Sequence, residues 1–263
     1  STLLMNLGIE STALGFMAGF TGDEIVRELQ VMGVKSDFIR IDEGISRINL
    51  KLKSIDGTEI NGSGPAISAD KVEQLMVQLD ALGEGDVLFL AGSIPSSMPD
   101  DMYRRIMARL EGKGVMIVVD ATRDLLVNVL KYHPFLVKPN NHELGEIFGV
   151  ELKDRESVIP YAKKMQEMGA ANVLVSMAGE GAVLAAANGK VYLAPAPKGT
   201  LVNGVGAGDS MVAGFLAGWL KEKDYCHAFH MGIATGSASA FSEYLATREQ
   251  IEEVYRQVTS EER

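Results

Sequence analysis

Several stretches of this chain are apolar without interruption, and segments with helical periodicity separate them. Clear examples are Asp86–Leu90, Gly114–Asp120 and Asn172–Ser176. A half-exposed strand alternates apolar and polar residues, so a strand without alternation is covered on both faces. Helical connections cover a sheet in this way when its strands run parallel. The pattern predicts an α/β protein with a doubly wound, mainly parallel sheet and helices on both faces.

Polar residues gather where these predicted strands end. They are Ser93, Asp120, Lys138 and Asn140. In open α/β sheets, ligands bind outside the carboxyl ends of the strands. We therefore expect a binding site at this edge of the sheet.

A different pattern covers Ile45–Lys53, where apolar and polar residues alternate as in a half-exposed strand. Asp56-Gly57 is a hairpin turn signal, and Thr58–Ile60 supplies a returning strand. Residues of about 45–62 are therefore expected to form a small β lid outside the main sheet. The whole chain, residues 1–263, is otherwise expected to be one domain.

Composition excludes several classes of partner. The formal net charge is −10, which argues against nucleic acid or an anionic membrane surface as a main partner. Cys226 is the only cysteine, which excludes an internal disulfide and fits a reducing, cytoplasmic environment. No apolar run approaches the ~20 residues needed to span a bilayer, so no membrane role is expected.

The stretch Asn203–Phe215 has the most distinctive composition. Its small residues are Gly204, Gly206, Ala207 and Gly208. They precede Asp209 and a strongly apolar helix, whose unpaired N–H groups and dipole favour a phosphate or an oxyanion. Asp209 would stand beside that anion as a proton acceptor, an arrangement that suits phosphoryl transfer. The alternative is a plain glycine turn in which the aspartate only complements the helix dipole.

Asn140 and Glu143 stand three residues apart at a predicted helix start, just after Lys138. At this spacing their side chains would face the same way, and their oxygens suit Mg²⁺. The alternative is an N-cap, with Asn140 as the capping residue and Glu143 three positions on. The residues alone leave both interpretations open.

The stretch Asn203–Phe215 resembles the C-terminal signature of the ribokinase-like carbohydrate kinases, the phosphofructokinase B type. The resemblance covers essentially the whole chain and is closest to the 1-phosphofructokinase branch. Segments that carry it include Ser46–Asn49, Thr58–Gly62, Ala91–Pro95 and Gly236–Ser242. It implies that the turn of Gly206, Ala207 and Gly208 is an anion hole and that Asp209 is the catalytic base.

The resemblance also implies ATP and Mg²⁺ as cofactors, with the magnesium held near Asn140 and Glu143. The segment Ser176–Gly181, which by itself is only a turn, would lie along the nucleotide. The implied nucleotide-binding residues are Lys138, Asn140, Ser176, Met177, Ala178, Gly179, Glu180, Gly181, Asn203, Gly208, Ile233, Ser237 and Ser239. For the last three, tight helix packing is an equally good explanation.

For the substrate, the resemblance implies that Arg47 holds the phosphate of a sugar phosphate and that Ser93 lines the sugar pocket. An exposed strand arginine can also simply be solvated. The implied reaction is ATP-dependent phosphorylation of D-fructose 1-phosphate, with Asp209 deprotonating the hydroxyl. The alternatives are a tagatose-6-phosphate or fructose-6-phosphate kinase, and a non-catalytic sugar-phosphate or nucleotide sensor. A homodimer formed through the β lid is also expected.

The family begins with a core strand and a Gly-Gly-Lys-Gly loop, and this sequence starts just after the position of that loop. The strand and loop are therefore expected to be missing from the present sequence. Without the strand, two neighbouring strands would be left with unpaired edges.

Overall fold

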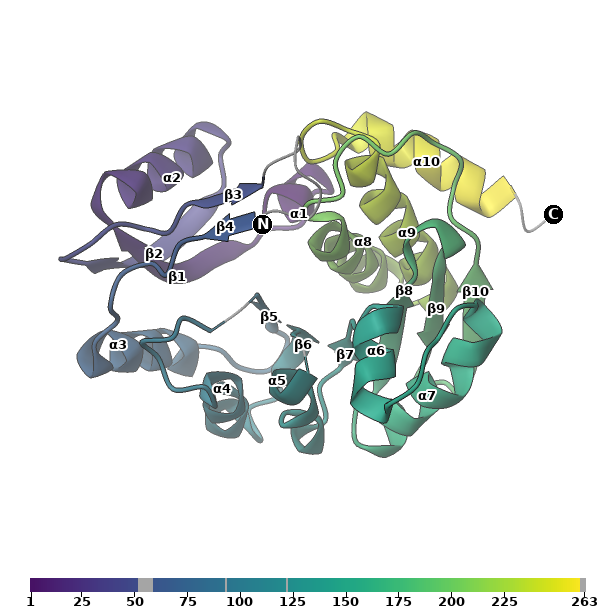
Figure 1. Ribbon diagram of the computed structural model, residues 1–263, viewed down its shortest axis with the longest axis horizontal. Coiled ribbons are helices and arrows are strands. Elements are labelled where there is room, and N and C mark those ends of the chain that lie inside the picture. The colour runs from purple at the N-terminus through teal and green to yellow at the C-terminus, as the bar shows by residue number, and fades with distance from the viewer. Residues whose placement is uncertain (52–58, 93, 122, 261–263) are drawn as a thin grey trace.

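The computed structural model describes residues 1–51, 59–92, 94–121 and 123–260. Its main sheet has six strands in the order β10-β9-β8-β7-β6-β5 (Figure 1). Their bounds are β5 Val87–Ala91, β6 Met116–Asp120, β7 Leu136–Val137, β8 Asn172–Ser176, β9 Ala182–Ala185 and β10 Val191–Ala194. Strands β5 to β8 are parallel, whereas β9 runs antiparallel to both β8 and β10. The expected mainly parallel α/β sheet is therefore confirmed.

Helices cover both faces of this sheet (Figure 1). One layer contains α3 Ala69–Asp80, α4 Met102–Leu110, α5 Arg123–Val127, η1 Leu130–Tyr132, α6 Asn141–Phe148 and α7 Arg155–Glu167. The other contains α1 Thr2–Asn6, α8 Ala207–Glu222, α9 Tyr225–Ala240 and α10 Arg248–Ser260.

Successive strand residues belong to opposite halves of the core. Val119 and Val137 pack in the cluster under the first helical layer, whereas Val118 and Leu136 pack in the cluster under α8 and α9. All four side chains are fully buried. Successive side chains of a strand point to opposite faces, so a sheet covered on both sides needs apolar residues at every position. This is why the strands show no alternation.

A second, two-stranded parallel sheet pairs β1 (Thr12–Ala18) with β2 (Lys35–Ile41), and α2 (Gly19–Val31) connects them. Among the described residues, β1 has no strand partner besides β2, and β5 ends the six-stranded sheet. Each of the two sheets therefore has an open edge there. None of the described helices is both long and apolar enough to cross a bilayer.

The β lid is a short antiparallel pair, β3 (Asn49–Lys51) with β4 (Glu59–Asn61), in which Leu50 lies opposite Ile60. The predicted turn at Asp56-Gly57 lies outside the described residues. The predicted strand over Ile45–Lys53 begins only at Asn49. Its first residues are held elsewhere, because Ser46 exchanges two hydrogen bonds with Ala18 at the end of β1. The N–H of Ser46 donates to the carbonyl of Ala18 at 2.9 Å, and its Oγ accepts from the N–H of Ala18 at 3.0 Å.

Candidate active site

The predicted anion-binding turn lies at the N-terminus of α8. Gly206 precedes the helix with a φ of +78°, a conformation that glycine adopts without strain. Its carbonyl accepts the first helical hydrogen bond, from the N–H of Ser210 at 2.8 Å. Among the described residues, no side chain caps this helix end. The N–H of Ala207 donates to the carbonyl of Gly204 at 3.3 Å. The N–H groups of Gly208 and Asp209 have no capping side chain among the described residues and could receive a phosphate.

Lys138 brings a positive charge to the same place. It follows β7 and is only 5% exposed, and its Nζ lies 3.2 Å from Oδ2 of Asp120, the last residue of β6. The same Nζ lies 3.0 Å from the point where a Cβ on Gly208 would stand. Gly208 therefore lacks a side chain where the ammonium of Lys138 packs against the helix.

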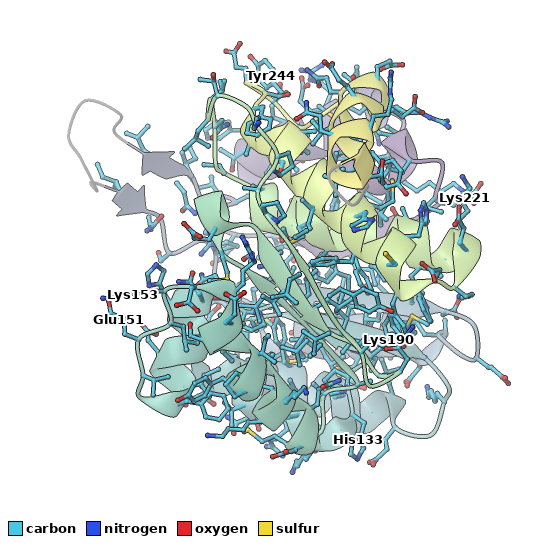
Figure 2. The ribbon with its side chains drawn as sticks, turned by 90° about the vertical axis from the view of Figure 1, so that its right-hand side faces the viewer. His133, Glu151, Lys153, Lys190, Lys221 and Tyr244 are labelled. Atoms are coloured by element: carbon cyan, nitrogen blue, oxygen red, sulfur yellow. The ribbon has the colours of Figure 1, made fainter. Side chains whose placement is uncertain are left out.

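Other lysines of this acidic protein lie at its periphery. Lys153, Lys190 and Lys221 are exposed and point outward, away from the sheet (Figure 2). Lys153 pairs with the equally exposed Glu151 at 3.2 Å. Lys138 differs from these residues because its charge is buried at the carboxyl edge of the sheet.

The pKa of Asp120 reflects the charges that surround it. Burial raises the pKa of its carboxyl to about 6, while the charge and hydrogen bond of Lys138 lower it. The negative charges of Asp209 and Glu143 raise this pKa further. The charges of three carboxyl groups thus act at this end of the sheet, where Lys138 places one buried ammonium. A divalent cation carrying nucleotide phosphates fits such a surrounding. No three described His, Cys, Asp or Glu side chains could hold a metal by themselves, so the cation would need phosphate or water ligands as well.

Asn140 and Glu143 form the capping box of α6. The side chain of Asn140 accepts from the N–H of Glu143, and Oε2 of Glu143 accepts from the N–H of Asn140, both at 2.8 Å. The capping alternative is therefore present in the structure. The backbone of Asn140 also forms an isolated parallel β-bridge with Ser176, which brings the ends of β7 and β8 side by side.

The segment Ser176–Gly181 forms a tight turn after β8, with the short helix η2 over Ala178–Glu180. The N–H of buried Met177 donates to the carbonyl of Gly181 at 2.9 Å, which closes the turn. A Cβ on Gly181 would stand 2.1 Å from a carbonyl oxygen of β10. Arg155 donates to the carbonyl of Glu180 and ties the turn to α7. The backbone of this segment is thus fixed beside Asn140.

Asn203 holds the loop that leads into α8. Its side-chain nitrogen donates to the carbonyl of Glu243 at 3.1 Å, and its oxygen accepts from the N–H of Val205 at 3.1 Å. Its own N–H donates to the carbonyl of Ala240. Asn203 therefore fixes the loop before the anion-binding turn.

The three predicted nucleotide residues of α9 differ in their burial. Ile233 is 1% exposed and packs in the core beneath α8. Ser239 is also buried, and its Oγ accepts from the N–H of Ala246 at 3.3 Å. Helix packing accounts for both of these residues. Ser237 is only half-buried.

Of the two predicted substrate residues, the structure describes Arg47. Arg47 is exposed and lies beside the end of β4, since a Cβ on Gly62 would be 3.4 Å from its Cβ. Ser93 lies outside the described residues. The structure thus places Asp209, Gly208, Lys138 and the Asn140–Glu143 pair around one edge of the sheet, and Arg47 at the lid.

Sequence reasoning gave no role to two residues of this site. Asp120 was expected only as a polar residue at a strand end. Tyr103 on α4 has the position of an ordinary core residue, yet its hydroxyl donates to the carbonyl of Gly92 at 2.9 Å. Burial raises the pKa of Tyr103 to about 12, and Asp120 and Asp209 add to that shift. No local pattern marks such a residue, because its importance comes from the loop that it holds.

Comparison with known proteins identifies the family of this chain. The profile described as "pfkB family carbohydrate kinase" matches residues 1–251. A 1-phosphofructokinase from Bacillus subtilis is 46% identical over 98% of this chain and 84% of its own length. A D-tagatose-1-phosphate kinase from Bacillus licheniformis is 34% identical over 98% of this chain and 84% of its own length. A crystal structure from Staphylococcus aureus, 41% identical, superposes with a TM-score of 0.88 over 98% of this chain and 83% of that one. The chain therefore belongs to the pfkB family of carbohydrate kinases.

Proposed function

We propose that this protein transfers the γ-phosphoryl group of ATP to D-fructose 1-phosphate and forms fructose 1,6-bisphosphate. The observation that carries the proposal is the placement of Asp209 in the uncapped first turn of α8, beside the buried ammonium of Lys138. The choice of sugar is supported by the Bacillus subtilis 1-phosphofructokinase, which matches almost the whole chain.

In the proposed reaction, Asp209 accepts the proton of the primary hydroxyl of the sugar phosphate. The hydroxyl oxygen forms the new bond to phosphorus, and the bond to the leaving oxygen of ADP breaks. The N–H groups in the turn of Gly206, Ala207 and Gly208 stabilise the charge that spreads over the transferred group. Lys138 offsets the negative charge of the phosphates. Catalysis of this kind rests on positioning and charge stabilisation.

The metal site of this proposal uses Glu143 and Asn140, directly or through water. Glu143 gives one carboxylate oxygen to the capping box, and its second oxygen can serve the cation. Bound Mg²⁺ would neutralise phosphate charge. The nucleotide would follow the turn of Ser176–Gly181, and Arg47 would bind the phosphate already present on the sugar.

The second candidate substrate is D-tagatose 1-phosphate, because one relative of similar coverage is named for it. The two sugars differ only in configuration at C4. The test is ADP release measured with fructose 1-phosphate, tagatose 1-phosphate, tagatose 6-phosphate and fructose 6-phosphate. We expect the highest kcat/KM with fructose 1-phosphate. A higher value with another sugar would overturn the substrate assignment, and binding without turnover would favour the sensor alternative.

The base assignment has its own test. Asp209→Asn should retain ATP binding and lose about 10²–10⁴ in kcat, the usual contribution of a positioned base. The matched control is Asp80→Asn, since Asp80 pairs with Arg109 and Lys113 at the surface. An Asp209→Asn variant with more than about a tenth of the normal kcat would show that another group takes the proton.

The assembly is proposed to be a homodimer formed through the β lid, in the cytoplasm. Large apolar side chains of the lid are exposed, with Ile48 at 59%, Leu50 at 50% and Ile60 at 58%. Neighbouring apolar side chains left open to water mark an interaction surface. A reducing compartment is supported by the presence of a single cysteine, Cys226, in the sequence.

A further inference from the structure

We propose that Asp120 is a positioning residue for phosphoryl transfer: it holds the ammonium of Lys138 against the first turn of α8, so that Lys138 and the helix N–H groups face the same anion. This inference rests on the proposed function, because it concerns the same site.

The position of Lys138 is unfavourable without a partner. Its side chain is 7% exposed, so the ammonium has lost nearly all of its contact with water. It also packs against Gly208 at the N-terminal end of a helix, where the helix dipole repels a cation. A carboxylate within hydrogen-bonding distance offsets both effects. Oδ2 of Asp120, 3.2 Å from Nζ, is that partner.

Both partners are fixed by the sheet. Asp120 is the last residue of β6, and its carbonyl accepts from the N–H of Gly92 at 3.3 Å. The N–H of Lys138 donates to the carbonyl of Val119 at 3.2 Å, so the backbone of Lys138 is held against β6. The separation of the two side chains is therefore set by strand pairing, and rigid elements hold functional groups more accurately than loops.

Two other carboxylates lie close to the pair of Asp120 and Lys138. Asp209 and Glu143 both lie near enough for their charges to act on Asp120. If Asp120 did not hold Lys138, the ammonium would be drawn toward one of them. A pair with Asp209 would neutralise the proposed base, and a pair with Glu143 would disturb the cap of α6. Asp120 thus keeps Lys138 on the phosphate and Asp209 available for the proton.

A double-mutant cycle tests this role. Asp120→Asn should lower kcat about 10–100-fold, the effect of a small misplacement in a catalytic site. In a Lys138→Met background, Asp120→Asn should change kcat by less than about twofold, because its effect acts through the lysine. Equal losses in both backgrounds would overturn the proposal and show that Asp120 acts directly on metal or substrate.

A conservative variant protects the test against a folding defect. Asp120→Glu keeps the charge one methylene away, and its kcat should exceed that of Asp120→Asn. A glutamate variant no better than the asparagine variant, with both folded by thermal unfolding, would contradict the positioning role. If Asp120→Asn does not fold, Asp120→Glu takes its place in the cycle. Its effect on kcat should then be larger with Lys138 present than in the Lys138→Met background. Asp80→Asn is the matched control, because its carboxylate also pairs with a lysine, Lys113, at 3.1 Å.

A binding measurement separates this proposal from the function on which it rests. Calorimetry with ATP and Mg²⁺, without sugar, should show weaker binding for Asp120→Asn than for the wild type when Lys138 is present. In the Lys138→Met background the two should bind within about twofold of each other. Absence of turnover with every sugar phosphate would refute the proposed function and leave this result standing. Equal weakening in both backgrounds would refute the positioning role whatever the substrate.

Discussion

The Nζ of Lys138 lies 3.0 Å, and its Cε 3.4 Å, from the point where a Cβ would stand on Gly208. A side chain at position 208 would therefore push the lysine away from the helix. Asp120 adds to this restriction, because its Oδ2 lies 4.0 Å from the same point. The position of the buried ammonium therefore depends on the absence of a side chain on Gly208.

Gly208→Ala should consequently lower kcat by about tenfold or more, since displacement of the ammonium misplaces the phosphate. Helix stability should not fall for intrinsic reasons, because alanine favours a helix more than glycine does. Steady-state kinetics and thermal unfolding measure the two effects. Gly83→Ala is the control, because a Cβ at Gly83 would meet nothing within 4 Å. A Gly208→Ala variant as active as this control would contradict the arrangement.

Arg47→Ala should raise the KM for the sugar phosphate far more than the KM for ATP. An arginine matches a phosphate with two hydrogen bonds, and loss of such a charge-assisted contact costs about 1.5–3 kcal/mol. The control is Arg27→Ala, an exposed arginine of α2 that pairs with Glu24. Equal increases in both KM values would indicate a defect of the lid or the dimer.

The stability of the protein should depend on pH through Asp120. Burial raises the pKa of this carboxyl to about 6 in the folded state, above its value of 3.8 when unfolded. The folded state therefore binds the proton more tightly, and this contribution to stability is present below pH 3.8 and lost as the pH rises through 6. Its size is about 3 kcal/mol. Urea unfolding between pH 4.5 and about pH 7.5 follows about 2 kcal/mol of this change. The free energy of unfolding of the wild type minus that of Asp120→Asn should decrease as the pH rises. An increase would have the wrong sign.

Ile60→Asp should convert a dimer into a monomer, because Ile60 and Leu50 lie opposite each other on the exposed lid and a charge there would be buried in the interface. Light scattering after size-exclusion chromatography measures the mass. Val77→Asp, at a 59% exposed position of α3, should leave the dimer intact. A monomeric wild type, or equal effects of both substitutions, would rule out the lid interface.

The sequence determined the sheet, because burial on both faces of a strand can be read from its side chains. The fully buried Val118 and Val119 are consecutive, and no pattern except uninterrupted apolarity fits that placement. It also indicated the start of α8, where small residues precede Asp209, and the anion-binding role of this turn stays a prediction. The lid hairpin was predicted as well, although the hydrogen bonds of Ser46 to Ala18 delay its first strand to Asn49.

Only the tertiary structure decided what the polar residues contact. For Asn140 and Glu143 the residues left a cap and a metal site open, and two hydrogen bonds of 2.8 Å show the cap, while the metal role stays a prediction. For Ile233 the tertiary structure shows a buried core position, and its contact with a nucleotide stays a prediction. Asp120 and Lys138 are distant in sequence and meet because neighbouring parallel strands end at the same edge. Local sequence patterns indicate whether a residue is buried or exposed. The residue that it pairs with depends on which strands become neighbours in the folded chain.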